Sequence, residues 1–311
     1  MKLPEAGSEP IDIRTTDGWS LRSEVHEPSQ EPVGVAVFAH ALMARRTEFS
    51  RPRGAGLVRL WVDRGWRVVT FDFRGHGDSD SGPRPSPAVG YDDFVLRDLP
   101  AVYDFARFHN ARGRPAVLVG HSLGGHAALA SQGAGRVAFD GIVAVGASVW
   151  LRELEPSMVR WLAKRASLAA AAAVARRLGW FPARALRLGS DDVSRACIDD
   201  LERFARTGRW QSSAGDVDYL ASLDRVRVPL LQIVSDGDRI ECPPDCGARF
   251  VAHCGGRPET MRIALGDDGG PPPDHMGIVT SGRARGVWER AEAWTRREVT
   301  RAPAHAGERM V

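Results

Sequence analysis

Short strand-like segments rich in apolar residues alternate along this chain with longer segments of helical periodicity. The predicted strands span residues 33–39, 67–71, 115–120, 142–147, 226–234 and 260–265. Residues 33–39 form a continuous apolar run, which is typical of a strand that is covered on both faces of a sheet. Between them, apolar residues recur every three or four positions over 57–65, 92–109, 246–253 and 286–298, which predicts helices. Strands that alternate with helices predict an α/β fold with a mostly parallel central sheet and helices on both of its faces.

Two local features modify this pattern. Residues 11–14 and 19–25 alternate polar and apolar positions around the turn Thr16-Asp17-Gly18, which predicts an antiparallel hairpin at the sheet edge. Pro100 lies inside the helix predicted over 92–109, where proline has no N–H to donate. We therefore expect that helix to kink near Pro100 or to begin a second part there.

The strand–helix alternation stops between Leu151 and Leu223, where we find no strand-like run. Trp161, the alanine-rich tract 166–175 and Phe204 predict helices with an aromatic face in this region. We therefore divide the chain into a core of residues 1–150 and 224–300, a helical insertion of residues 151–223, and a disordered tail of residues 301–311.

Composition and charge narrow the choice of partners. Apolar residues make up 43% and charged residues 26% of the 311 residues, as in ordinary globular proteins. The 42 basic residues, of which only Lys2 and Lys164 are lysines, are interleaved with 39 acidic ones, so we expect no nucleic-acid partner. The first ten residues lack the apolar segment of a signal peptide, and no run reaches the roughly 18 apolar residues of a membrane span. We therefore predict a cytoplasmic location.

Four cysteines raise the question of a metal site. Cys242, Cys246 and Cys254 lie close together in the sequence, with His253 beside the last, and Cys197 lies further away. Thiolate and imidazole are ligands that suit zinc. However, three residues separate Cys242 from Cys246, where a zinc knuckle has two. We therefore expect buried or incidental thiols, with no metal and no other cofactor.

The candidate chemistry centres on residues 116–126, Ala-Val-Leu-Val-Gly-His-Ser-Leu-Gly-Gly-His. Four apolar residues lead into Gly-x-Ser-x-Gly, and a pattern of small helical residues follows, which predicts a strand, a sharp turn and a helix. Gly120 and Gly124 leave room where the turn is tight. Ser122 is then expected at the apex of the turn, with its hydroxyl exposed beside the N-terminus of the helix.

Two motifs resemble those of the α/β-hydrolases, the fold of esterases and lipases. The run from Gly120 to Gly125 resembles the nucleophile elbow of that superfamily, and residues 72–79, Asp-Phe-Arg-Gly-His-Gly-Asp-Ser, resemble its Asp-x-Arg-Gly-x-Gly-x-Ser loop. The resemblance extends from about Val33 to Trp294. Within it, residues 90–106 and 178–188 are similar to a poorly characterised bacterial subgroup of hydrolases. The resemblance implies that residues 151–223 form a cap over the active site.

A serine hydroxyl needs a base within hydrogen-bond reach, and the base needs an acid to hold its tautomer. In this fold the order along the chain is serine, acid, histidine. His275 follows the last predicted strand, as the catalytic histidine of the superfamily does. His253 lies inside a predicted helix and His305 lies in the tail, so we assign the base to His275.

The acid is expected just after the strand at 226–234, where both Asp236 and Asp238 occur. The family pattern places the acid a few residues before a proline that opens a helix, here Pro243, which favours Asp238. Asp236 precedes Gly237, and Asp-Gly is a common turn pair.

An oxyanion hole needs two backbone N–H donors. Leu123, directly after the nucleophile, supplies the first. The resemblance places the second after the strand at 33–39, where the superfamily usually has His-Gly-x and this chain has His40-Ala41-Leu42. By position the second donor is Leu42. Alanine adopts a positive φ less readily than glycine, so if the family's loop needs a positive φ at this position, we expect the loop of this chain to have a different shape.

The remaining histidines near these motifs have structural interpretations. We interpret His40 and His76 as non-catalytic, because both precede Ser122 in the chain, and the resemblance implies that residues at such positions brace loops beneath the site. We expect His126, which lies on the helix that follows the elbow, to be a packing residue, and His121 to line the rim of the pocket.

These motifs predict a serine hydrolase that cleaves a carboxylic ester or related acyl bond through an acyl-enzyme. An acyltransferase with the same triad and a non-catalytic ligand-binding protein on the same fold are the alternatives. The expected partner is a small hydrophobic acyl substrate, and the sequence does not determine the oligomeric state. Residues 158–180 combine Trp161 with the basic residues Lys164, Arg165, Arg176 and Arg177. We expect this segment to pack on the core with its basic side chains in water, without contact to a membrane.

Overall fold

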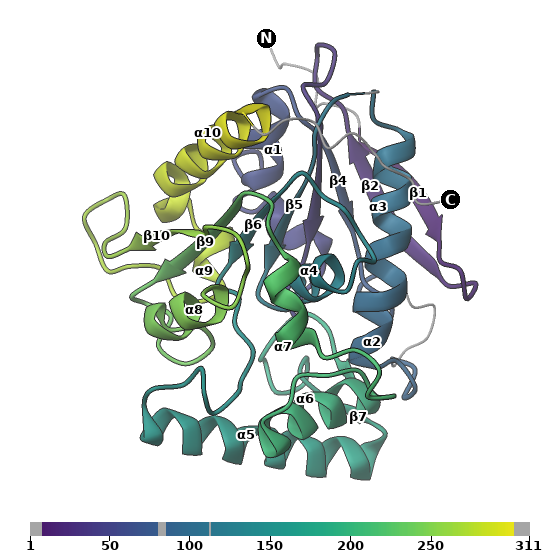
Figure 1. The fold of residues 1–311 in the computed structure, drawn as a ribbon, viewed down its shortest axis with the longest axis vertical. Coiled ribbons are helices and arrows are strands. Elements are labelled where there is room, and N and C mark those ends of the chain that lie inside the picture. The colour runs from purple at the N-terminus through teal and green to yellow at the C-terminus, as the bar shows by residue number, and fades with distance from the viewer. Residues whose placement is uncertain (1–7, 80–84, 112, 302–311) are drawn as a thin grey trace.

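An eight-stranded sheet runs through the middle of the molecule (Figure 1). The computed structural model describes residues 8–79, 85–111 and 113–301. The strand order is β1-β2-β4-β3-β5-β6-β9-β10. The strands are β1 (Ser8–Arg14), β2 (Ser20–His26), β3 (Val35–Ala39), β4 (Arg67–Phe71), β5 (Ala116–His121), β6 (Gly141–Val145), β9 (Leu230–Ser235) and β10 (Glu259–Ile263). β1 pairs with β2 and β2 with β4 in antiparallel fashion, and the other strand pairs are parallel. The predicted sheet with an antiparallel hairpin at its edge is confirmed.

Helices cover both faces of this sheet, so its central strands are buried on both sides. On β3, Val35 and Val37 pack into one apolar cluster, while Ala36 and Phe38 point into the other. This follows from the alternation of side chains along a strand. The helices of the first face are α3 (Leu99–Phe108), α4 (Leu123–Gly133) and α8 (Pro244–Val251), and those of the second are α1 (Leu57–Asp63), α9 (Gly277–Thr280) and α10 (Arg285–Arg301). The single turn η4 (Gly282–Ala284) joins α9 to α10.

The helix predicted over 92–109 consists of three parts. It begins as α2 (Tyr91–Asp93), continues as a π-helical segment η2 (Phe94–Asp98) and ends as α3. Pro100 is the second residue of α3. Because its ring displaces the carbonyl group one turn earlier and it has no N–H to donate, the wider π turn precedes it.

Residues 151–223 form mostly helical structure, and the two long helices of this segment lie at the end of the molecule far from α1 and α10 (Figure 1). The elements are α5 (Met158–Leu178), β7 (Trp180–Phe181), β8 (Val193–Ser194), α6 (Arg195–Thr207) and α7 (Tyr219–Ser222), followed by the turn η3 (Leu223–Arg225). The expectation of no strand here was wrong, because β7 and β8 form a short antiparallel pair. Two residues per strand are too few to produce a periodic pattern. The buried positions of α5 recur every three or four residues and form one stripe: Trp161, Lys164, Leu168, Ala172 and Ala175.

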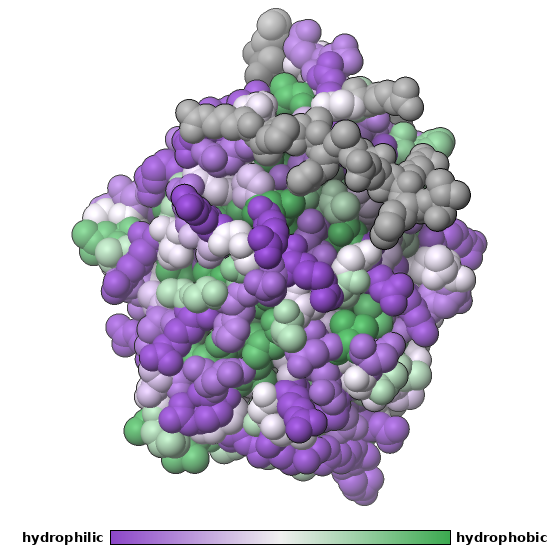
Figure 2. All heavy atoms as spheres, in the orientation of Figure 1, coloured by the Kyte–Doolittle hydropathy of each residue, from purple (hydrophilic) through white to green (hydrophobic). Residues whose placement is uncertain are grey.

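The surface gives no further assignment. On the face seen in Figure 2, hydrophilic residues predominate and apolar residues occur in small separate groups. Within the described ranges, every helix is too short or too polar to cross a membrane. The cytoplasmic location and the division into core and insertion stay predictions, and residues 302–311 of the predicted tail lie outside the described residues.

Candidate active site

Ser122 sits in a strained turn between β5 and α4. Its φ is 51° and its ψ is −113°, a conformation that costs a residue with a side chain about 1–3 kcal/mol. The surrounding glycines explain how the turn fits. A Cβ at Gly124 would lie 2.1 Å from the carbonyl oxygen of Ala39, and one at Gly120 would lie 2.6 Å from the carbonyl carbon of Gly124. Glycine is therefore required on both sides of the serine, as the sequence predicted.

His275 lies in the loop between β10 and α9, and its ring contacts Asp238 at the end of β9. Nδ1 of His275 is 2.5 Å from Oδ2 of Asp238. The other oxygen of Asp238, Oδ1, accepts a hydrogen bond of 3.0 Å from the N–H of Cys242. Asp236 instead pairs with Arg262 at 2.6 Å on the surface. The structure thus brings Asp238, and not Asp236, to the histidine.

Burial and the contacts between Asp238 and His275 shift the pKa of each of these two groups in opposite directions. Burial lowers the pKa of His275, but the hydrogen bond and charge of Asp238, with smaller effects of Glu241 and Glu48, raise it above its ordinary value of 6.5. Burial raises the pKa of Asp238, and the hydrogen bond and charge of His275 outweigh it, so the net direction is downward. Asp238 is therefore a carboxylate, and Nε2 is the ring nitrogen of His275 that is left for proton transfer.

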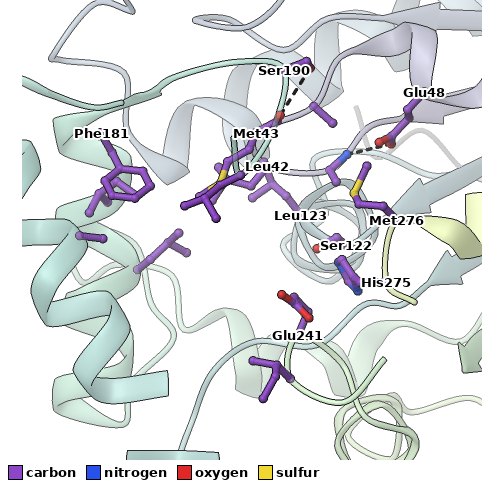
Figure 3. Close-up of a pocket in the computed structure, with 18 of the residues that line it drawn as sticks. Leu42, Met43, Glu48, Ser122, Leu123, Phe181, Ser190, Glu241, His275 and Met276 are labelled. Atoms are coloured by element: carbon purple, nitrogen blue, oxygen red, sulfur yellow. Dashed lines mark hydrogen bonds between the residues drawn. The ribbon is translucent and has the colours of Figure 1, made fainter. Parts of the chain in front are cut away.

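Ser122 and His275 line the same cavity, which has a volume of about 960 Å³. Figure 3 shows them beside each other at its wall. Core and insertion both contribute to the lining. The core supplies Leu42, Met43 and Met276, and the insertion supplies Leu168, Phe181 and Phe204. A mostly apolar cavity of this size is typical of a small-molecule site.

Leu42 and Leu123, the two predicted oxyanion donors, also line this cavity (Figure 3). In the part of the chain that the structure describes, no protein oxygen accepts a hydrogen bond from the N–H of either residue. The residue with positive φ in this loop is Met43, at 55°, and not Ala41. The loop of residues 40–44, which carries the predicted donor Leu42 and is called the oxyanion loop for that prediction, therefore reaches the cavity without a glycine after His40.

Glu48 supports the oxyanion loop, and no motif in the sequence pointed to it. It lies in the short helix η1 (Arg46–Ser50) and is 4% exposed. Its Oε1 accepts a hydrogen bond of 3.0 Å from the N–H of Ala41 and lies 3.2 Å from Nδ1 of His121. Nε2 of His121 lies 3.1 Å from the backbone carbonyl oxygen of His275. The expectation that His121 lines the pocket rim was wrong. It is fully buried and connects Glu48 to the His275 loop, because successive residues of β5 and the elbow point in opposite directions.

Comparison with known proteins assigns a family to this arrangement. A model of the family described as serine aminopeptidase, S33, matches residues 41–266, which is more than half of the chain. The chain belongs to this family of α/β-hydrolases.

Individual relatives share only limited sequence identity with this S33-family hydrolase. A mouse protein, sn-1-specific diacylglycerol lipase ABHD11, is 36% identical over 96 residues, which are 30% of this chain and 26% of the mouse protein. The structure is similar to the esterase domain of a Rhodothermus marinus protein, with a TM-score of 0.59, 22% identity, and coverage of 94% of this chain and 99% of that one. It is also similar to a Paleococcus ferrophilus monoacylglycerol lipase, with a TM-score of 0.58, 17% identity, and coverage of 88% and 98%. At these identities the two structures establish the fold alone.

The insertion of this hydrolase is bound directly to the oxyanion loop. The carbonyl oxygen of Met43 accepts a hydrogen bond of 2.8 Å from the N–H of Ser190 (Figure 3). Asp191 forms two hydrogen bonds to Arg45, at 2.8 and 2.6 Å, and accepts a third of 3.1 Å from the N–H of Gly77. Burial raises the pKa of Asp191, but the contacts with Arg45 outweigh it, and the net shift is downward. Asp191 is therefore a carboxylate that joins the insertion to two loops of the core.

The two histidines predicted to brace loops do lie among loop backbones. Nδ1 of His40 donates to the carbonyl oxygen of Ala41 at 2.7 Å, and its Nε2 accepts from the N–H of Phe73 at 3.0 Å. Burial lowers the pKa of His40 to about 4, so the ring is neutral and this tautomer satisfies both contacts. His76 is also buried, with Nδ1 3.1 Å from the carbonyl oxygen of Arg74. The prediction for His126 was incomplete, since it is buried in the core but also lines the cavity.

The cysteines do not form the metal cluster that their spacing raised as a possibility. All four are buried free thiols. Within the described ranges, the group of possible metal ligands that lie close together is Asp238, Glu241 and His275, whose ligand atoms are within 4.8 Å of one another. The hydrogen bond between Asp238 and His275 accounts for two of these three side chains.

Proposed function

We propose that this protein hydrolyses carboxylic esters with Ser122 as nucleophile, His275 as general base and Asp238 as the acid that orients it. The observation that carries the proposal is the contact of 2.5 Å between Asp238 and His275 at the wall of a cavity that Ser122 also lines. The strained backbone of Ser122, at the N-terminus of α4, supports the nucleophile assignment.

In the proposed mechanism, Oγ of Ser122 attacks the ester carbonyl carbon while Nε2 of His275 takes the hydroxyl proton. The negative charge that develops on the carbonyl oxygen is stabilised by the N–H groups of Leu123 and Leu42. His275 then gives the proton to the departing alcohol oxygen, which leaves an acyl group on Ser122. Water attacks this acyl-enzyme with His275 as base, and the acid product is released.

The cavity favours a hydrophobic ester as the substrate. Its volume of about 960 Å³ and its lining of leucine, methionine and phenylalanine side chains suit a medium or long hydrocarbon chain. The mouse relative is named as a diacylglycerol lipase, which is consistent with an ester substrate.

The test compares wild-type protein with Ser122→Ala on p-nitrophenyl esters from acetyl to lauryl, and on aminoacyl p-nitroanilides. We expect hydrolysis of the longer esters, its loss in the variant, and fluorophosphonate labelling of wild-type protein at Ser122. Full esterase activity of Ser122→Ala would refute the proposal, and so would turnover of the anilides but not of the esters. A competing alcohol in the same assay distinguishes hydrolysis from acyl transfer by its products.

A further inference from the structure

One buried polar side chain in the cavity has no part in the proposed triad. His126 lies on α4, one turn after Ser122, and is 7% exposed. Its ring stacks on Tyr91, with centroids 5.6 Å apart, and the edge of Trp210 packs against it at 6.1 Å. Both neighbours are themselves buried. The ring is therefore held in one orientation in a wall that is otherwise mostly apolar.

The hydrogen bond of His126 to Tyr91 determines which ring nitrogen carries the proton. The hydroxyl oxygen of Tyr91 is 2.8 Å from Nδ1 of His126. Among the described residues this nitrogen is the acceptor available to the hydroxyl proton of Tyr91, and a buried hydroxyl left without an acceptor is unfavourable. Nδ1 therefore accepts. Because burial lowers the pKa of His126 to about 3, the ring is neutral, and its one proton is on Nε2.

Nε2 of His126 has no protein partner in the described part of the chain. This nitrogen is not fully enclosed by protein atoms, and His126 lines the cavity, so Nε2 is open to the cavity. The side chains from the insertion that line the same cavity include Leu168, Phe181 and Phe204. An oriented N–H donor thus faces a space surrounded largely by hydrocarbon, where a hydrogen bond contributes strongly to selectivity.

We propose that His126 is a substrate-binding residue whose Nε2–H selects esters with a second oxygen, in an ether, keto or hydroxyl group, a few bonds from the scissile carbonyl. The proposal rests on the proposed function, because it takes the cavity to hold an ester that reacts at Ser122. The distance follows from the helix, since His126 lies four residues after Ser122, which corresponds to a rise of about 6 Å along the helix axis.

The kinetic test uses p-nitrophenyl esters of one chain length in which an ether oxygen replaces successive methylene groups of the acyl chain. A matched series has the ether oxygen on the alcohol side. We expect one position to give a kcat/KM about fivefold above that of the plain chain in wild-type protein. This preference should disappear in His126→Phe, which keeps a flat ring without a donor, and should persist in part in His126→Gln, which has an N–H near the place of Nε2.

The double variant Tyr91→Phe/His126→Phe serves as a control, because it leaves no buried hydroxyl without a partner. It should resemble His126→Phe in selectivity while unfolding closer to the wild-type temperature. The histidine ¹⁵N shifts of wild-type protein should show His126 protonated at Nε2, and Tyr91→Phe should change this signature.

Equilibrium binding tests the proposal without catalysis. Long-chain alcohols and their ether analogues of equal length are titrated into wild-type protein and into His126→Phe. We expect wild-type protein to bind one ether analogue more tightly than the plain alcohol, and His126→Phe to bind both alike. The absence of any such preference in wild-type protein, or its persistence in His126→Phe, would overturn the proposal whether or not the protein hydrolyses esters. Loss of ester hydrolysis alone would refute only the proposed function.

Discussion

Replacing Asp238 with asparagine changes a buried oxygen beside His275 into an amide group, and we expect it to remove most of the activity. The N–H of Cys242 donates to Oδ1 of Asp238 at 3.0 Å, so the amide of the variant directs its carbonyl oxygen there and its NH₂ group to His275. An amide NH₂ group only donates. Nδ1 of His275 must then accept and Nε2 must carry the proton, which prevents Nε2 from taking a proton from Ser122.

A triad histidine in the wrong tautomer costs about 10³- to 10⁴-fold in turnover, which corresponds to about 4–5.5 kcal/mol of barrier. The assay is kcat/KM on the best p-nitrophenyl ester, with thermal unfolding as a check on the fold. Asp236→Asn is the matched control. Asp236 pairs with an Arg262 side chain that is 64% exposed, so the pair contributes only about 0–1 kcal/mol to stability. We expect Asp236→Asn to retain kcat/KM within about twofold. An Asp238→Asn variant within tenfold of wild type, or an equal loss in Asp236→Asn, would refute the reasoning.

Three further predictions test the supports of the site. Glu48→Ala removes the acceptor that holds the oxyanion loop, so kcat should fall about 10- to 100-fold at nearly unchanged KM. Glu48→Gln keeps an oxygen that can accept this hydrogen bond, so it should retain most of the wild-type kcat. Equal losses of kcat in the two variants would contradict the role of Glu48 as a support of the loop. Burial lowers the pKa of His275, but Asp238 and Glu241 raise it above 6.5 overall, so kcat/KM should rise with pH through a midpoint above 6.5. Glu241→Gln should move this midpoint lower, because the charge of Glu241 contributes to the raised pKa of His275, and an unchanged profile would count against this effect. In Gly124→Ala the new Cβ would lie 2.1 Å from the carbonyl oxygen of Ala39 on β3. Urea denaturation should therefore show that the free energy of unfolding falls by about 3 kcal/mol or more. A variant as stable as the wild type would show that the elbow adapts to the extra methyl group.

The parts of the fold that the sequence predicted are those with a local cause. The central strand β3 appeared as a continuous apolar run, because both faces of the sheet are covered there. The β7–β8 pair did not appear, because two residues per strand leave no pattern and backbone hydrogen bonds alone define it. Pro100 predicted an interruption of its helix, but the π-helical form of that interruption depends on packing.

The same distinction holds for the candidate site. Ser122, Asp238 and His275 could be located because each follows a strand end or lies between glycines, although their catalytic roles stay predictions. Glu48 and His121 are 73 residues apart, and Arg45 and Asp191 are 146 residues apart. No local spacing connects such pairs, so their contacts become visible only in three dimensions.

The attachment of Asp191 to Arg45 and Gly77 has a consequence for engineering. Residues 151–223 invite exchange between relatives as a way to graft new selectivity. A donor segment without a carboxylate at this position would free the loop that carries Leu42, and the chimera would lose rate along with its original preference. Transplants that retain Ser190 and Asp191 should keep the turnover of the recipient while adopting the selectivity of the donor.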